Sequence, residues 1–148
     1  MDISLYQIIS FSIILLFSLI LSVQDARRME VKVYIQWLAI FCALVCHLIF
    51  AHGEIWIYIL SGILMVAFYF AVKIITKNKL GTADVWFGIF QGLFLTPFLI
   101  PVCLSAEVVA VLIIVNKRSG HQRFAFIPYM SFGLIISYLL QAAGFIKY

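Results

Sequence analysis

Long apolar stretches separated by short polar turns organise the chain. The first stretch, Ile3–Val23, contains no Lys, Arg, Asp or Glu, and neither do Val33–Ala51 and Ile55–Val72. Each stretch is close to the roughly 20 mostly apolar residues that an α-helix needs to cross a bilayer. We therefore expect three transmembrane helices in the first half of the chain.

The second half is also apolar, but prolines interrupt it. The stretch Val85–Ala106 carries no charge and contains Pro97 and Pro101. Proline cannot continue a helix, so we expect a fourth helix to end at these residues. Ser105 and Glu107 resemble the N-cap and first turn of a short fifth helix on the outer side of the membrane.

A sixth charge-free stretch, Phe124–Ile146, completes the pattern. The sequence predicts an all-α polytopic membrane protein with six transmembrane helices, short loops and one domain over residues 1–148. The N-terminal stretch lacks a basic segment and a small-residue cleavage site before it, so we expect a retained helix and no cleaved signal peptide.

Composition supports this fold class and excludes others. The chain has 148 residues, of which 66% are hydrophobic and 11% charged. Soluble domains average about 45–50% apolar and about 25% charged residues, so a soluble globular or disordered protein is excluded. Three cysteines in apolar stretches cannot form a disulfide framework.

The basic residues indicate an orientation. Nine of the ten Lys and Arg residues lie in the turns after the first, third and fifth stretches. The positive-inside rule places these turns in the cytoplasm and both termini outside. The basic excess is thereby explained by topology, and no nucleic-acid partner is expected. The nine residues are Arg27, Arg28, Lys32, Lys73, Lys77, Lys79, Lys117, Arg118 and Arg123.

Two acids at the same edge are the candidate chemistry. Asp25 lies at the end of the first helix and Asp84 at the start of the fourth. Ionisable groups at membrane level are costly and usually functional. Two carboxylates close together share a proton, so one can activate a water while the other polarises a peptide carbonyl. Taken singly, each aspartate is better explained by an ion pair or a helix cap than by catalysis.

Three motifs make the chain resemble the type IV prepilin peptidases, which are intramembrane aspartyl proteases with a GxGD motif. An aspartate followed by a basic turn is found at Asp25–Arg28, and a Leu-Gly-x-x-Asp motif at Leu80–Asp84. A late segment, Phe126–Gly133, contains an Ile-Pro-aromatic sequence. The resemblance spans nearly the whole chain.

The resemblance implies a reaction and its residues. Such enzymes cut prepilin-like membrane proteins at the cytoplasmic face, between a short basic leader and the apolar helix that follows. Asp25 and Asp84 would be the catalytic pair, no metal or cofactor is expected, and the partners would be the precursor and the cell membrane. The motifs also supply candidate supporting residues: Gly81, Thr82, Ala83, Gln91 and Pro128.

The chain departs from the family pattern at three places. Ala83 replaces the usual second glycine, Trp86 replaces a frequent lysine, and Val31 begins the segment that usually reads Ile-Pro-Asn. Large bacterial members also carry a four-cysteine zinc region and methylate their product. We expect a small stand-alone form, with peptidase activity and no methyltransferase activity.

Other polar residues have simpler interpretations. Cys42, Cys46 and His47 are expected to pack in the core, since a metal site needs a more polar setting. Gln91 points along the face of Asp84, and packing against another helix is favoured for it over a role at the site. Gly88-x-x-x-Gly92 is expected to allow close helix approach inside the bundle.

Two other function classes remain open at this stage. A small ion or proton transporter would use Asp84 and Glu107 as carrier sites. A non-catalytic assembly protein would keep the fold of the peptidase and lack its chemistry.

Overall fold

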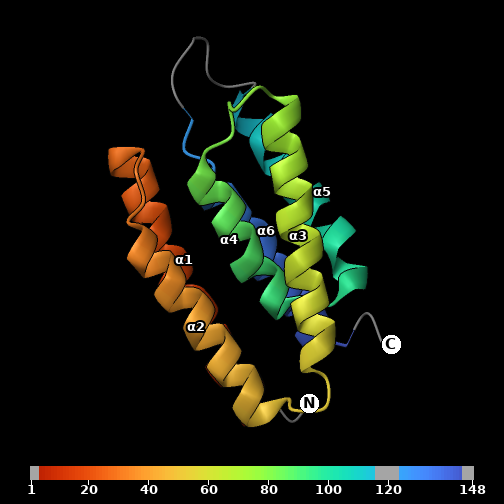
Figure 1. Ribbon diagram of the computed structural model, residues 1–148. Coiled ribbons are helices and arrows are strands. Elements are labelled where there is room, and N and C mark those ends of the chain that lie inside the picture. The colour runs from red at the N-terminus through yellow and green to blue at the C-terminus, as the bar shows by residue number, and fades with distance from the viewer. Residues whose placement is uncertain (1–3, 116–123, 145–148) are drawn as a thin grey trace.

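The computed structural model describes residues 4–115 and 124–144, and its helices account for most of them (Figure 1). Six α-helices confirm the all-α prediction in this part of the chain. They are α1 (Leu5–Arg28), α2 (Val33–Phe50), α3 (Ile55–Ile75), α4 (Thr82–Phe94), α5 (Ile100–Val115) and α6 (Ile127–Ala142), with a 3₁₀ turn, η1 (Pro97–Leu99), before α5.

Four segments are long and apolar enough to cross a membrane. They are α1, α2, α3 and the continuous stretch Pro97–Ile114, which joins η1 to most of α5. Helix α6 is apolar but shorter, with 16 residues. Helix α4 has 13 residues and is therefore about 20 Å long, less than the apolar thickness of a bilayer. The four long apolar segments identify the chain as a polytopic membrane protein.

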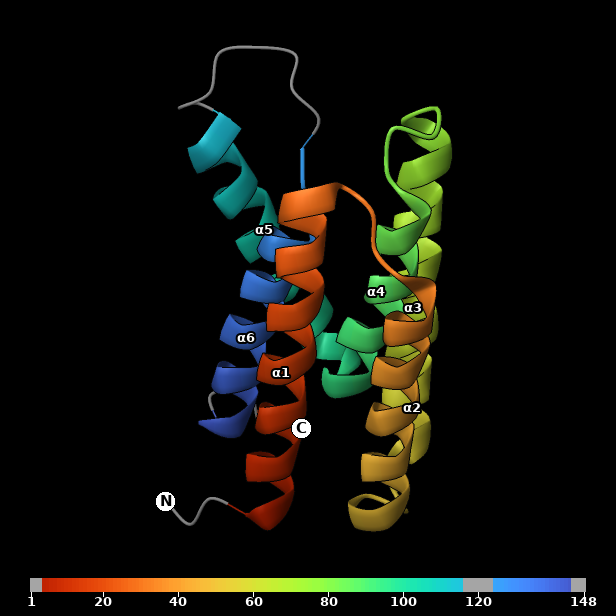
Figure 2. The same ribbon diagram turned by 90° about the vertical axis from the view of Figure 1, so that its left-hand side faces the viewer.

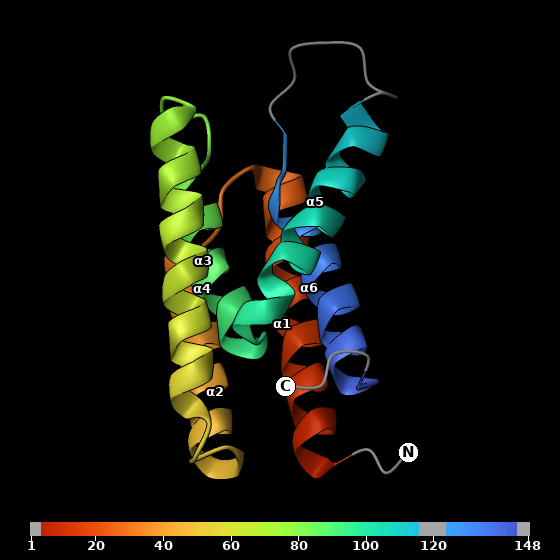
Figure 3. The same cartoon turned by 90° about the vertical axis from the view of Figure 1, so that its right-hand side faces the viewer.

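The described basic turns gather at one end of the bundle. The helices run roughly along one axis, with α5 inclined to the others (Figures 2 and 3). The ends of α1 and α3 and the starts of α4 and α6 share one end, where the described basic turns also lie. The start of α1 and the end of α6 lie at the opposite end. The turn with Lys117, Arg118 and Arg123 lies outside the described residues.

Helix α4 stops where the prolines predict. Leu95 and Thr96 adopt extended backbone conformations directly before Pro97, as expected for a residue that precedes proline. Pro101 is the second residue of α5, a first-turn position in which proline is tolerated.

The predicted start of the fifth helix is wrong. Helix α5 begins at Ile100, so Ser105 lies inside it and does not cap it. The Ser105 hydroxyl donates instead to the carbonyl of Val102 at 2.8 Å. The cap pattern misled because a serine inside a helix can satisfy its hydroxyl on the preceding turn.

Close approach of α3 and α4 depends on glycine. A Cβ atom at Gly92 would lie 2.5 Å from the Cα of Gly62 and 2.5 Å from the carbonyl oxygen of Ser61. At Gly88 a Cβ would meet the ring of Tyr69 at 2.5 Å. The two glycines of the Gly-x-x-x-Gly motif therefore pack inside the bundle, as predicted, and bring α4 directly against α3.

Candidate active site

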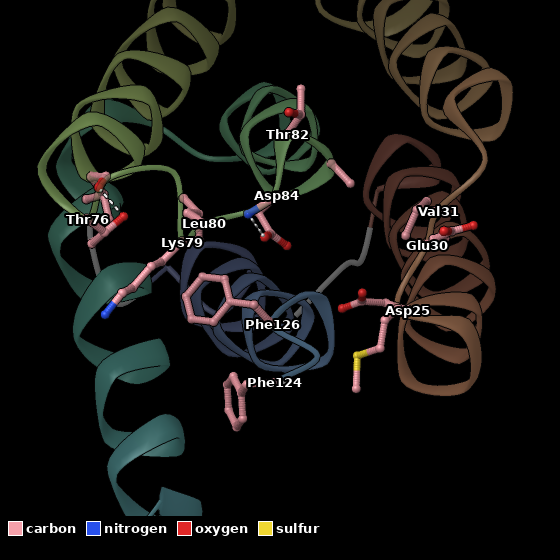
Figure 4. A pocket seen from close by; sticks show the side chains of 14 residues that line it. Asp25, Glu30, Val31, Thr76, Lys79, Leu80, Thr82, Asp84, Phe124 and Phe126 are labelled. Atoms are coloured by element: carbon pink, nitrogen blue, oxygen red, sulfur yellow. Dashed lines mark hydrogen bonds between the residues drawn. The ribbon is translucent and has the colours of Figure 1, made fainter. Parts of the chain in front are cut away.

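A pocket of about 600 Å³ opens at the polar end of the bundle. The ends of α1 and α3, the start of α4 and the segment before α6 form its walls. Asp25 and Asp84 line it from opposite sides (Figure 4). Residues far apart in the sequence thus meet at one cavity, and its lining includes Glu30, Lys79, Gly81 and Phe126.

Asp25 lies in the last turn of α1 and is anchored to the start of α6. Its Oδ2 accepts a hydrogen bond from the backbone N–H of Ile127 at 3.0 Å. Ile127 is the first residue of α6, where N–H groups lack partners within the helix and the helix dipole favours negative charge. The buried carboxylate is therefore oriented by the backbone of another helix.

Asp84 lies in the first turn of α4 and is anchored to the residue before that helix. Its Oδ2 accepts a hydrogen bond from the N–H of Gly81 at 3.0 Å. Gly81 has an ordinary φ of −67°, so no left-handed conformation requires glycine here. A Cβ at this position would lie 3.0 Å from Oδ2 of Asp84, so the glycine allows the carboxylate to approach the backbone.

The two carboxylates point towards one another across the pocket (Figure 4). Both side chains are buried, with 9% and 8% of Asp25 and Asp84 exposed. Burial, and to a smaller extent the charge of Asp25, raises the pKa of Asp84 above its ordinary value, while the Gly81 hydrogen bond opposes this. Such a pair favours holding one proton between its members near neutral pH.

Comparison with known protein families assigns the chain to one of them. Residues 12–116 match the model of the type IV leader peptidase family. The chain belongs to this family. The match covers more than two thirds of the sequence and includes both aspartates. Neither curated proteins nor solved structures give a match to the chain.

Membership of the leader peptidase family makes the chain a peptidase that acts on a membrane protein. The pocket at the polar end holds the two residues that the family resemblance marks for catalysis. The leader peptidase motif at residues 80–84 forms one wall of this pocket.

Two side chains from other helices hold this motif in place. Lys73 donates to the hydroxyl of Thr82 at 2.6 Å, and Gln36 donates to the carbonyl of Ala83 at 2.8 Å. Ala83 is the second residue of α4 and its φ is not positive, so alanine fits where the family usually has glycine. Gln36 was not predicted, although a glutamine in an apolar stretch was a signal for such a contact.

Gln91 and Pro128 lie away from the pocket lining. The Gln91 amide donates to the carbonyl of Met130 at 2.8 Å and to Oε1 of Glu107 at 2.6 Å. It therefore joins α4 to α5 and α6, which supports the packing interpretation. Pro128 follows Ile127 in the first turn of α6 and marks the helix start that holds Asp25.

The predicted position of Glu107 in the first turn of the fifth helix is also wrong. Glu107 lies in the interior of α5, with 2% of its surface exposed, and is not in the first turn of an outward-facing helix. Tyr69, Gln91 and Cys103 donate hydrogen bonds to its carboxylate. Gly133 makes room for it, since a Cβ there would lie 2.6 Å from Cγ of Glu107. Glu107 does not line the pocket of Asp84 and lines instead a cavity between α3 and α5.

The residues considered for a metal make packing contacts. His47 is buried, bonds the Tyr6 hydroxyl through Nδ1 at 3.0 Å and stacks on Tyr58 with ring centroids 4.4 Å apart. The Cys46 thiol lies 3.6 Å from the Ser10 hydroxyl. Within residues 4–115 and 124–144, no three His, Cys, Asp or Glu side chains are grouped to hold a metal ion.

Proposed function

We propose that the chain is an aspartic endopeptidase that removes the basic leader from prepilin-like precursors at the cytoplasmic face of the cell membrane. Asp25 and Asp84 are its catalytic pair. The observation that carries the proposal is that both carboxylates point into one pocket from different helices. Each is already oriented by a backbone N–H, so little rearrangement is needed to act on a bound peptide.

The pair can carry out hydrolysis with one shared proton and one water. The ionised aspartate takes a proton from water, while the protonated aspartate donates a hydrogen bond to the scissile carbonyl. The oxygen of that water then bonds to the carbonyl carbon. As the C–N bond breaks, a proton passes from the pair to the leaving nitrogen, and the pair is restored with one proton.

The position of the basic turns supports a cytoplasmic active site. The pocket lies at the same end as the described basic residues, including Arg27, Arg28 and Lys73, and this excess marks the cytoplasmic side in membrane proteins. The acids of the pocket also suit a substrate whose leader is basic. In a single peptidase domain over residues 1–148, the pocket would open to the cytoplasm and both termini would lie outside.

Co-expression with a prepilin-like precursor tests the chemistry. Asp25→Asn and Asp84→Asn should each abolish cleavage, because neither amide can exchange the proton. Glu54→Gln changes an acid in the turn between α2 and α3, at the other end of the bundle, and should cleave at the parent rate. Cleavage by both asparagine variants at the parent rate would refute the pair mechanism.

A labelling experiment tests the orientation. A single cysteine at Lys77, in the turn after α3, should react with an impermeant thiol reagent only after the cell membrane is opened. Replacement of the three native cysteines by alanine provides the background. Labelling of intact cells at this position would place the pocket outside.

A further inference from the structure

A second cavity lies between α3 and α5, beside the active-site pocket. It has a volume of about 260 Å³, and nearly all of its lining is apolar. α3 and α5 are not among the closely packed helix pairs, and they diverge towards the polar end (Figure 3). We call this cavity the α3–α5 groove. Its walls include Phe68 and Val72 of α3 and Leu104, Val108 and Leu112 of α5.

The α5 wall has the spacing of a helix-packing surface. Its apolar groove residues Leu104, Val108, Val111 and Leu112 stand at positions i, i+4, i+7 and i+8, which places them on one face of the helix together with Glu107. Val108 and Leu112 are 56% and 61% exposed, so no other helix of the described residues covers them. Rows of this kind receive the ridges of another helix.

The α3–α5 groove adjoins the active-site pocket. Val72, Leu80 and Phe126 line both cavities. An apolar segment that occupies the groove therefore ends beside the pocket that contains Asp25 and Asp84. Its position beside the two aspartates distinguishes the groove from an ordinary lipid-facing depression.

We propose that the α3–α5 groove binds the apolar helix of the membrane-protein substrate and thereby positions the bond to be cut. This proposal rests on the proposed function, in which the scissile bond immediately precedes that helix. With the helix in the groove, the bond lies in the pocket and the basic leader extends past Asp25 and Glu30. A phospholipid fits less well, since its phosphate would then lie near the same acids.

Two pairs of neighbouring exposed residues on α5 allow a matched test, because one member of each pair lines the groove and the other does not. Val108 and Leu112 line the groove, whereas Val109 and Ile113, which are 54% and 55% exposed, do not. Val108→Trp and Leu112→Trp should lower kcat/KM for the full-length precursor at least tenfold, because the indole fills the groove. Val109→Trp and Ile113→Trp should keep the parent value.

A direct contact measurement complements the kinetics. A photoreactive residue at position 112, in an Asp84→Asn background that retains the precursor, should cross-link to the precursor's apolar helix. The same residue at position 113 should not. Equal kcat/KM for the Val108→Trp and Val109→Trp variants, or cross-links to lipid alone at position 112, would overturn the proposal.

Failure of the proposed function would look different. In that case the parent would leave the precursor intact, or Asp84→Asn would cleave it. A parent that cleaves, an Asp84→Asn variant that does not, and indifference to tryptophan at positions 108 and 112 would reject the groove alone.

Discussion

The contact between Gly92 and Gly62 should control the position of Asp84. Gly92→Ala would place a Cβ atom 2.5 Å from the Cα of Gly62 and from the carbonyl oxygen of Ser61. Both of these atoms belong to the backbone, so no side-chain rotation relieves the overlap. Ordinary contact begins near 3.4 Å, and α4 must therefore move from α3 by about 0.9 Å.

This shift of α4 should lower both the stability of the protein and its cleavage rate. Overpacking of this kind costs about 1–3 kcal/mol. Because α4 carries Asp84, the carboxylate would move relative to Asp25 by a similar distance, and a misplacement of about 1 Å can lower a rate about 100-fold. We expect Gly92→Ala to unfold at lower temperature and to cleave a prepilin-like precursor far more slowly.

Gly62→Ala is the matched control in the same interface. Its added Cβ would meet its nearest neighbours at 3.6 Å, which is ordinary contact. Each substitution gains about 0.5–1 kcal/mol of helix propensity, so the difference between the variants isolates the overlap. Thermal unfolding in one detergent and cleavage rates of both variants are the assays. Equal stability and equal rates for Gly92→Ala and Gly62→Ala would refute the reasoning.

Three further predictions concern the carboxylates. Gly81→Ala should lower kcat with little change in folding, because its Cβ would lie 3.0 Å from Oδ2 of Asp84; an unchanged kcat would contradict this. Tyr69→Phe should lower stability by about 1–3 kcal/mol, since the buried Glu107 loses a donor, and calorimetry in micelles measures the loss. The pair must keep one proton, and the raised pKa of Asp84 preserves that proton at higher pH than in an ordinary aspartate. Cleavage should therefore persist near neutral pH and fall under alkaline conditions, whereas a pH–rate profile that rises steadily through alkaline pH would exclude a shared proton.

Much of the fold could be predicted from the sequence because its signals are local. Apolar stretches of about 20 residues specify helices in a bilayer, and Pro97 sterically restricts the residue before it. These rules gave the number of helices and the end of α4. The basic turns also placed Asp25 and Asp84 at one edge, whereas their meeting in one pocket depends on how α1, α4 and α6 pack.

The remaining features depend on contacts between distant segments. Glu107 is buried because Tyr69, Gln91 and Cys103 supply donors and Gly133 supplies space. No local pattern around residue 107 encodes these neighbours, and a serine two residues earlier imitated a helix cap. The hydrogen bond between Asp25 and Ile127 crosses 102 positions of sequence and could not be found without the fold.

Both candidate catalytic carboxylates are held by main-chain N–H groups, at Ile127 and Gly81. Side-chain replacement at a donor position leaves the amide in place unless proline is introduced, because the donor is common to the other residue types. At Ile127 the geometry is consequently buffered against sequence drift in the donor side chain, whereas at Gly81 an added Cβ would lie 3.0 Å from Oδ2 of Asp84. A saturation library at position 127 should retain cleavage for most apolar residues and lose it with proline, so diversity there is compatible with unchanged chemistry.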